Sequence, residues 1–240
     1  MSSIRHDCIT CKVRGCSILC HCDTHTLATI STYKIPGSLI KGEKLFSEGD
    51  PVKGVYFIKS GFLKVELNGK HGRPLILQFA GKGTMFGHRT NLSHSCHTTS
   101  AVAVTGVQYC YIPSQAFIDI VCNSSVLKQQ ILNQILNELD LVEKKVINLA
   151  HKTVREKIAA ALLLIADVYE YEQKRQSFRI CFCRQDIADL AGTTKEQVSK
   201  TLKDFEKEKL IRCTAKKFSY LHINSLRVIS ENHPLSREGS

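Results

Sequence analysis

Cysteine is the residue type with the most chemistry to offer in this sequence. The 240 residues include eleven cysteines, of which five fall within the first 22 positions. These five are Cys8, Cys11, Cys16, Cys20 and Cys22. Cysteines that only fill a core would be scattered, whereas metal ligands on a short loop gather in this way. Thiolates bind zinc and iron–sulfur clusters in preference to hard cations. The grouping therefore predicts a metal-binding loop.

A complete disulfide framework is not expected, because eleven is an odd number and no export signal is visible. Charged residues such as Arg5, Asp7 and Lys12 stand where a signal peptide would have an apolar segment. No apolar run approaches the roughly 18 residues of a membrane span. We therefore expect a cytoplasmic protein with no membrane partner. Cys22 is expected to be a bystander. Five other cysteines are expected to be small buried hydrophobic residues: Cys96, Cys122, Cys181, Cys183 and Cys213.

Basic residues outnumber acidic ones, and their excess is unevenly distributed. The net charge is +11. Residues 1–81 and residues 151–217 each carry +5, whereas residues 82–150 carry only +1. A basic surface is compatible with nucleic-acid binding. The sequence indicates a nucleic-acid partner for the basic excess in residues 151–217. It indicates no partner for the excess in residues 1–81.

The first half of the chain is predicted to form a β-roll. Eleven of the fourteen glycines lie between Gly37 and Gly106, and they separate short runs rich in β-branched and aromatic residues. The runs expected to be strands are Val55–Ile58, Phe62–Leu67, Leu75–Phe79 and Val102–Val104. Turns such as Asn68-Gly69 connect them.

A long helix is predicted from about Val126 to Leu149, where glycine is absent. Five apolar residues follow the four–three spacing of a coiled coil and define the predicted dimerisation seam: Ile135, Leu139, Val142, Val146 and Leu149. Self-association through the seam is the favoured interpretation. The alternative is that the seam packs against the β-roll of its own chain.

The C-terminal part has the pattern of a winged helix-turn-helix. Helices are expected at Val154–Tyr171, Gln185–Leu190 and Thr194–Lys209, with a hairpin at Ile211–Ile223. Ala188 is small where two helices cross, and Gly192 can take the positive φ of the turn. The residues expected to contact DNA are Thr194, Lys195, Glu196, Ser199 and Lys200 of the second helix and Lys216 and Lys217 of the wing. The alternative is an ordinary solvated helix face.

These patterns predict an α+β fold: an N-terminal double-stranded β-roll, a long dimerisation helix and a C-terminal winged helix-turn-helix. The expected divisions are a Cys-rich segment (1–25), the roll (26–122), the helix (123–150), the DNA-binding domain (151–230) and a tail (231–240). No catalytic constellation is visible, so an enzyme is not expected. A thiol–disulfide oxidoreductase using Cys8 and Cys11 is a weak alternative, because no βαβ unit surrounds that pair.

The order of these parts resembles the Crp/Fnr family of bacterial transcription regulators. The stretches Gly42–Asp50, Tyr56–Gly61 and Lys195–Lys200 carry the resemblance. It implies a homodimer that binds a palindromic DNA operator and contacts RNA polymerase. Glu196, Ser199 and Lys200 fall on the base-reading positions of the family, although Lys200 replaces the usual arginine and cannot make its bidentate contact with guanine. Binding of cAMP is not expected, because His88 stands where the ribose-binding glutamate belongs and His97-Thr98 lies near the phosphate-binding arginine position.

The cysteines resemble those of the FNR oxygen sensors within this family. The N-terminal spacing is Cys8-x2-Cys11-x4-Cys16-x3-Cys20, and Cys110 precedes an Ile-Pro step as the fourth ligand does in those sensors. The resemblance implies a [4Fe–4S] cluster bound by Cys8, Cys11, Cys16 and Cys110. Cys20 is an alternative ligand, since the second gap is four residues and not the usual five. An oxygen- or NO-labile cluster would control the dimer. The alternative is a regulator of this family that uses zinc, haem, thiol oxidation or a small ligand.

Overall fold

The computed structural model describes residues 7–69, 74–89, 96–168, 182–214 and 218–231. They belong to two compact units. The first comprises residues up to Leu67 together with Ala80–Leu141, and the second comprises Asn68–Phe79 together with residues from Val142 onward. No helix among the described residues is long and apolar enough to cross a membrane.

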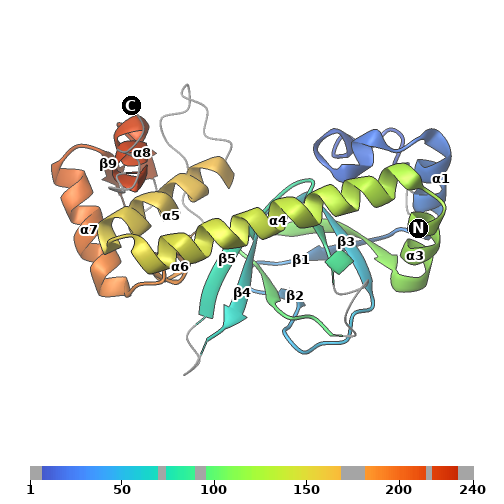
Figure 1. Cartoon of the computed structure of the whole chain (residues 1–240), viewed down its shortest axis with the longest axis horizontal. Helices are drawn as coiled ribbons and strands as arrows, with labels where there is room; N and C mark the ends of the chain where they lie inside the picture. Colours follow the sequence, from blue (N-terminus) through green and yellow to red (C-terminus); the bar gives the residue numbers. More distant parts are fainter. Residues whose placement is uncertain (1–6, 70–73, 90–95, 169–181, 215–217, 232–240) are drawn as a thin grey trace. The chain divides into compact units, whose positions relative to one another are not determined.

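The β-roll consists of two antiparallel sheets (Figure 1). One has the strand order β1-β8-β3-β6 and the other the order β2-β7-β4-β5. Their bounds are β1 Ile35–Leu39, β2 Lys44–Phe46, β3 Gly54–Ser60, β4 Leu63–Asn68, β5 Pro74–Ala80, β6 Met85–Phe86, β7 Ser100–Ala103 and β8 Val107–Pro113. The four predicted strands are thus confirmed as β3, β4, β5 and β7, except that Phe62 and Val104 lie just outside β4 and β7.

Helices close one end of the roll, where α1 (Thr24–Tyr33), α3 (Ser114–Cys122) and the start of α4 (Ser125–His151) gather (Figure 1). One buried hydrophobic cluster joins them to the sheet and to the N-terminal segment. Its members include Leu19, Leu27, Phe57, Phe117 and Leu127. The predicted long helix is confirmed as α4, whereas α1 and α3 are helices that the sequence patterns did not indicate.

The second unit contains the predicted helix-turn-helix. Its helices are α5 (Val154–Val168), α6 (Arg184–Ala191) and α7 (Lys195–Lys207), followed by the hairpin of β9 (Ile211–Cys213) and β10 (Phe218–Tyr220). The predicted end of the first of these helices, beyond Val168, lies outside the described residues. The chain does not end with the hairpin, because α8 (Ile223–Glu231) follows it and packs against α5. Ile223, the predicted end of the hairpin, and Glu231, the predicted start of the tail, thus belong to a helix, in which Leu226 is fully buried.

Candidate functional site

A cavity of about 270 Å³ in the first unit brings three of the predicted metal ligands together. Cys8 and Cys11 come from the N-terminal segment, and Cys110 comes from β8, about a hundred residues further along the chain. Most of the other lining residues are apolar, among them Phe57 and Ile112. The cavity therefore offers three thiols in a largely apolar setting.

The pairing of the strands fixes Cys110. Strand β8 lies between β1 and β3, and Cys110 is opposite Pro36 on one side and Phe57 on the other. Because Pro36 and Phe57 also line the cavity, Cys110 lies on the wall that the sheet presents to it. Burial raises the pKa of the Cys110 thiol, and Lys59 and Lys34 oppose that shift.

A short relay of hydrogen bonds holds Cys8 against α1. The amide of Cys8 donates to the hydroxyl of Ser31 at 2.9 Å, and that hydroxyl lies 2.9 Å from Oδ1 of Asp7. Asp7 also accepts from the amide of Ile9 at 3.0 Å. Hydrogen bonds from Ile9 and Ser31 hold the pKa of the Asp7 carboxyl below its ordinary value. Cys8 is only 7% exposed, so its thiol is fixed inside the unit.

The rest of the N-terminal segment winds through tight turns. They include two 3-10 helices, η1 (Arg14–Cys16) and η2 (Ile18–His21). Cys16 is exposed, its thiol donates to the carbonyl of Val13 at 3.2 Å, and it does not line the cavity. Its carbonyl packs against Gly83, which has φ +88 and where an added Cβ would lie 2.0 Å from that oxygen. Cys20 is half-buried and also lies outside the cavity lining.

The donor set of the cavity fits a thiolate-bound metal centre. Three thiols line one apolar space, and the other two cysteines considered as ligands, Cys16 and Cys20, follow Cys11 within nine residues. Among the described residues, no three His, Cys, Asp or Glu side chains stand at metal-binding distances. The described geometry thus brings together the thiols of Cys8, Cys11 and Cys110 but does not itself choose between Cys16 and Cys20.

The remaining cysteines differ from one another. Cys22 is 4% exposed, and burial followed by the charges of Asp23 and Cys20 raises its pKa to about 11. Burial and Glu206 likewise raise the pKa of Cys213 to about 11. The expectation of burial is wrong for Cys96, Cys122 and Cys183, which are exposed. Cys122 ends α3 and Cys183 precedes α6, and the ends of helices lie at the surface. Cys181 lies outside the described residues.

His88 follows β6 and contacts the long helix within the first unit. It is 3% exposed, and its Nε2 lies 3.3 Å from Oε1 of Glu138 on α4. Arg89 Nη1 lies 3.9 Å from Oε2 of the same carboxylate, and the amide of Gln134 donates to it at 2.9 Å. His97 is also buried and stacks on the ring of Phe46 at 3.9 Å. The histidine expected at a ribose-binding position therefore pairs with α4, a contact that sequence patterns did not indicate.

The helix-turn-helix has the geometry that its sequence predicts. Gly192 has φ +62, and an added Cβ there would lie 2.5 Å from a methyl group of Leu149. Ala188 is fully buried. Thr194 is the N-cap of α7, and its hydroxyl oxygen accepts from the amide of Gln197 at 3.3 Å. Four apolar residues are buried in the two helices: Ile187, Leu190, Val198 and Leu202.

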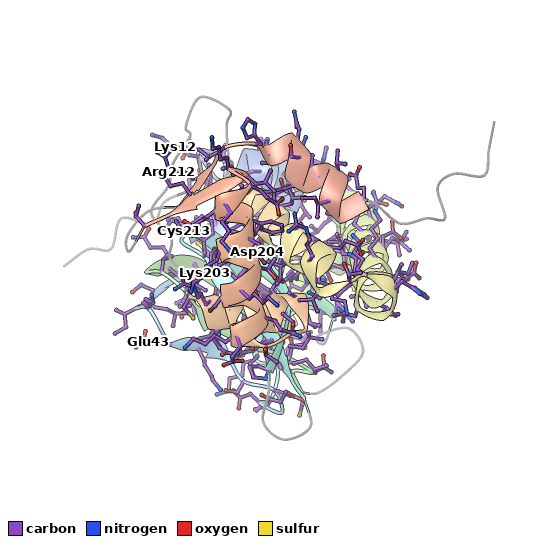
Figure 2. All side chains as sticks on the ribbon, turned by 90° about the vertical axis from the view of Figure 1, so that its left-hand side faces the viewer. Lys12, Glu43, Lys203, Asp204, Arg212 and Cys213 are labelled. Atoms are coloured by element: carbon purple, nitrogen blue, oxygen red, sulfur yellow. The ribbon has the colours of Figure 1, made fainter. Side chains whose placement is uncertain are left out.

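The first turns of α7 present polar side chains. Lys195, Glu196 and Lys200 are exposed, while Ser199 is half-buried and donates to the carbonyl of Lys195 at 2.9 Å. Lys216 and Lys217 lie outside the described residues. Figure 2 looks onto α7 and labels Lys203 on this helix and Arg212 on β9, the strand that contacts α7. Both are exposed, so this face of the second unit carries basic groups beyond those predicted.

Ionic contacts hold α7 and α6 in place. Arg155 of α5 lies 2.6 Å from a carboxylate oxygen of Glu208, and its guanidinium stands 4.6 Å from the ring centre of Phe205. Lys145 donates to the carbonyl of Leu190 at the end of α6. Burial lowers the pKa of Lys145 to about 8. A lysine at the C-terminus of a helix satisfies a carbonyl that has no partner within the helix.

The predicted seam divides into two kinds of residue. Ile135 packs against the hydrophobic cluster of the first unit, and Leu149 is half-buried beside Gly192 in the second. Leu139, Val142 and Val146 are between 42% and 60% exposed. Leu132 and Leu136, which are not part of the predicted seam, are 50% and 52% exposed. Leu132, Leu136 and Leu139 are separated by four and three residues. With a helical period of 3.6 residues, they therefore lie on one side of α4.

Comparison with known proteins agrees with this architecture. Residues 37–124 match the cyclic nucleotide-binding domain, and residues 156–229 match the Crp-like helix-turn-helix domain. The chain is 26% identical over 237 residues to electron transport regulator A of Shewanella oneidensis, covering 93% of this chain and 94% of that protein. It is 27% identical over 183 residues to the fumarate and nitrate reduction regulatory protein of Vibrio cholerae, covering 76% and 73%. FixK2 from Bradyrhizobium japonicum has the same fold, with a TM-score of 0.74 and 20% identity over 83% of this chain and 98% of that one.

The two domains and their order define a DNA-binding transcription regulator, and the relatives are regulators and not enzymes. The chain belongs to the Crp/Fnr family. The resemblance stated from the sequence is thereby confirmed, as is the α+β fold class.

The contact between His88 and Glu138 predicts a pH dependence of stability. Burial alone would raise the pKa of Glu138, but His88, Gln134 and Arg89 together hold it below its ordinary value of 4.5. The ionised carboxylate therefore stabilises the fold above that value, and this contribution is lost as the pH falls through the lower folded value.

We expect Glu138→Gln to remove this part of the dependence. Between about pH 6 and about pH 3.5, the urea midpoint of the wild-type protein should fall more steeply than that of the variant. Far-UV circular dichroism measures the midpoint, since the chain has no tryptophan. Asp140→Asn changes an exposed carboxylate on the same helix and should leave the slope unaltered. Equal slopes for the wild-type protein and Glu138→Gln would contradict the interpretation.

Proposed function

We propose that this chain is a homodimeric, sequence-specific transcription regulator controlled by an oxygen- or NO-sensitive [4Fe–4S] cluster. The observation that carries the proposal is the meeting of Cys8, Cys11 and Cys110 in one cavity. The fourth ligand is Cys16 or Cys20, and the family resemblance favours Cys16. The names of relatives, among them a fumarate and nitrate reduction regulator and an electron transport regulator, agree with redox sensing.

The packing of the chain's own residues explains how such a cluster would affect α4 and the dimer. When bound, the cluster would supply cross-links between the N-terminal segment and β8 that oxygen or NO can remove. Cys8 belongs to the same buried hydrophobic cluster as Leu127 and Ile131 at the start of α4. A change in how tightly the N-terminal segment is held therefore alters the packing beneath α4. The exposed apolar side of α4 is the proposed dimer contact, so the two events are linked through one core.

Dimerisation in turn determines DNA binding. Two copies of α7 are needed to occupy two half-sites of a palindromic operator, and a monomer binds only one. We assign base contacts to Glu196, Ser199 and Lys200. Phosphate contacts are assigned to Lys195, to the wing residues Lys216 and Lys217, and to Thr194 at the helix N-terminus. RNA polymerase is the expected protein partner at the promoter.

A second candidate is a regulator of the same architecture that holds zinc. The same three thiols favour it, because zinc also prefers thiolate ligands in a tetrahedral set. The two differ in colour and composition, since an iron–sulfur protein contains inorganic sulfide and absorbs visible light, whereas a zinc protein does neither. Metal analysis of the full-length protein therefore separates them.

Anaerobic purification should yield a brown protein with about four iron and four sulfide per chain that bleaches in air. Cys110→Ala should lose both, because it removes the ligand on the wall of the sheet. Of Cys16→Ala and Cys20→Ala, we expect the first to lose iron and sulfide and the second to keep them. Cys122→Ala, at an exposed cysteine remote from the N-terminal loop in sequence, is the control. A colourless wild-type protein that contains zinc would contradict the iron–sulfur proposal and support the second candidate, a regulator that holds zinc.

A charge on the exposed apolar side of α4 should abolish the dimer. Val142→Lys and Leu136→Lys each place an ammonium group where we expect a buried interface, and a buried unpaired charge is costly. Sedimentation of the anaerobic protein should then give a folded monomer. Asn137→Lys adds the same side chain at an exposed polar position of α4 and should remain dimeric. An unchanged dimer in both apolar-site variants would disprove the assignment.

Glu196→Ala should relax base preference at one position of each half-site. Loss of a specific base contact costs about 1–3 kcal/mol of discrimination, while affinity for unrelated DNA changes little. Binding to an operator library by the wild-type protein and the variant measures this. Lys217→Ala should weaken binding to every sequence alike. Lys203→Ala is the control, because Lys203 lies two turns beyond Glu196 in α7 and should not alter base preference. Equal losses on all sequences for Glu196→Ala would argue against base reading.

A further inference from the structure

The thiol cavity is lined by three cationic side chains, and none of its lining residues in the described part of the chain is acidic. Arg14 belongs to η1, Lys34 follows α1, and Lys59 belongs to β3. Because they come from three separate places in the sequence, their convergence is a product of the fold. They also account for part of the basic excess in residues 1–81, for which the sequence offers no partner.

Lys34 lies within hydrogen-bonding distance of a thiol. Its Nζ lies 3.2 Å from Sγ of Cys8, which is hydrogen-bonding distance for sulfur. Its backbone is fixed on both sides, since its amide donates to the carbonyl of Ile30 at the end of α1 at 3.0 Å and the next residue begins β1. Strand β1 is in turn paired with β8, which carries Cys110. The same elements therefore position the ammonium group and two of the thiols.

The charge of the expected occupant makes this placement significant. A zinc ion or an iron–sulfur cluster bound by four thiolates carries a net negative charge, and burying a net charge in an apolar cavity is costly unless it is compensated. Hydrogen bonds to ligand sulfurs and nearby positive charge also raise the reduction potential of such a centre. Lys34 can supply both, and Lys59 and Arg14 add positive charge from other sides.

We propose that Lys34 is a positioning residue of the thiol cavity, whose ammonium group, held against Cys8 and assisted by Lys59 and Arg14, stabilises an anionic metal–thiolate centre. The proposal rests on the proposed function in so far as it requires a thiolate-bound metal, but it holds for either metal. It assigns a role to residues that provide no ligand themselves. Its consequence is that the stability of the centre depends on charge next to Cys8 as well as on the cysteines.

Anaerobic full-length protein with Lys34→Met tests this, because methionine keeps much of the length of lysine without its charge. We expect iron and sulfide per chain close to the wild-type values, a lower reduction potential in a potentiometric titration, and bleaching in air that is roughly three- to tenfold faster. Lys34→Arg should restore both properties, and Lys59→Met should produce a smaller change in the same direction. Lys41→Met, at an exposed lysine outside the cavity, is the control.

A second measurement separates failure of this proposal from failure of the proposed function. Cobalt(II) titration of the metal-free protein, followed by thiolate-to-metal absorption, reports on the cavity without requiring iron or sulfide. Weaker cobalt binding by Lys34→Met than by Lys41→Met would support the proposal even if the wild-type protein holds no iron–sulfur cluster. Indistinguishable potentials, bleaching rates and cobalt affinities for Lys34→Met and the wild-type protein would overturn it. A wild-type protein that binds neither cobalt nor iron would overturn both proposals.

Discussion

The thiol cavity depends on the antiparallel pairing of β8 with β1 on one side and β3 on the other. This pairing places Cys110 between Pro36 and Phe57, on the wall of the cavity. The pairing also fixes the start of β1 and therefore the end of α1, because α1 directly precedes β1. The N-terminal segment with its thiols lies just before α1 in the chain. Side-chain direction alternates along a strand, so a register shift of one residue would turn Cys110 to the other face of the sheet. The position of Cys110 in the site follows from this one constraint.

The hydrophobic cluster beneath the cavity gives the site a physical route to α4. Cys8, Leu19 and Cys22 of the N-terminal segment share that cluster with Leu127 and Ile131 of α4. Protein interiors are close-packed, so a displacement on one side of such a cluster is not absorbed locally. The contact between His88 and Glu138 is a second connection from the roll to the same helix. Both connections reach α4 on its inner side, while Leu132, Leu136 and Leu139 remain exposed. A sensor that acts through packing needs this arrangement, in which one side of a helix is held and the other side is available.

Periodicity made the large elements predictable, and contacts between distant residues were not. The spacing of apolar residues identified α4, and Gly192 with Ala188 identified the helix-turn-helix, because each reflects a local backbone requirement. Helix α8 was missed because its nine residues offer too few turns for a periodic pattern. The pairing of Glu138 with His88 was missed because ion pairs between elements leave no signature in sequence spacing. The seam was placed on the correct helix, but five residues spaced by four and three could not reveal that Ile135 and Leu149 already have partners in their own units.

The lysines of this chain fall into exposed and half-buried groups, and their surroundings determine what each can do. The lysines of α7 are exposed, so their interaction with a phosphate backbone is screened by salt and steers binding more than it fixes geometry. Lys145 is half-buried and donates to a helix-terminal carbonyl, and burial lowers its pKa to about 8. Lys34 and Lys59 are also half-buried, and both line an apolar cavity. Attraction between a cation and an anion is stronger in such surroundings than in water. Two or three cations in this setting can influence a metal–thiolate centre more than the larger number on the surface, which explains why the distribution of the basic residues is more informative than their total.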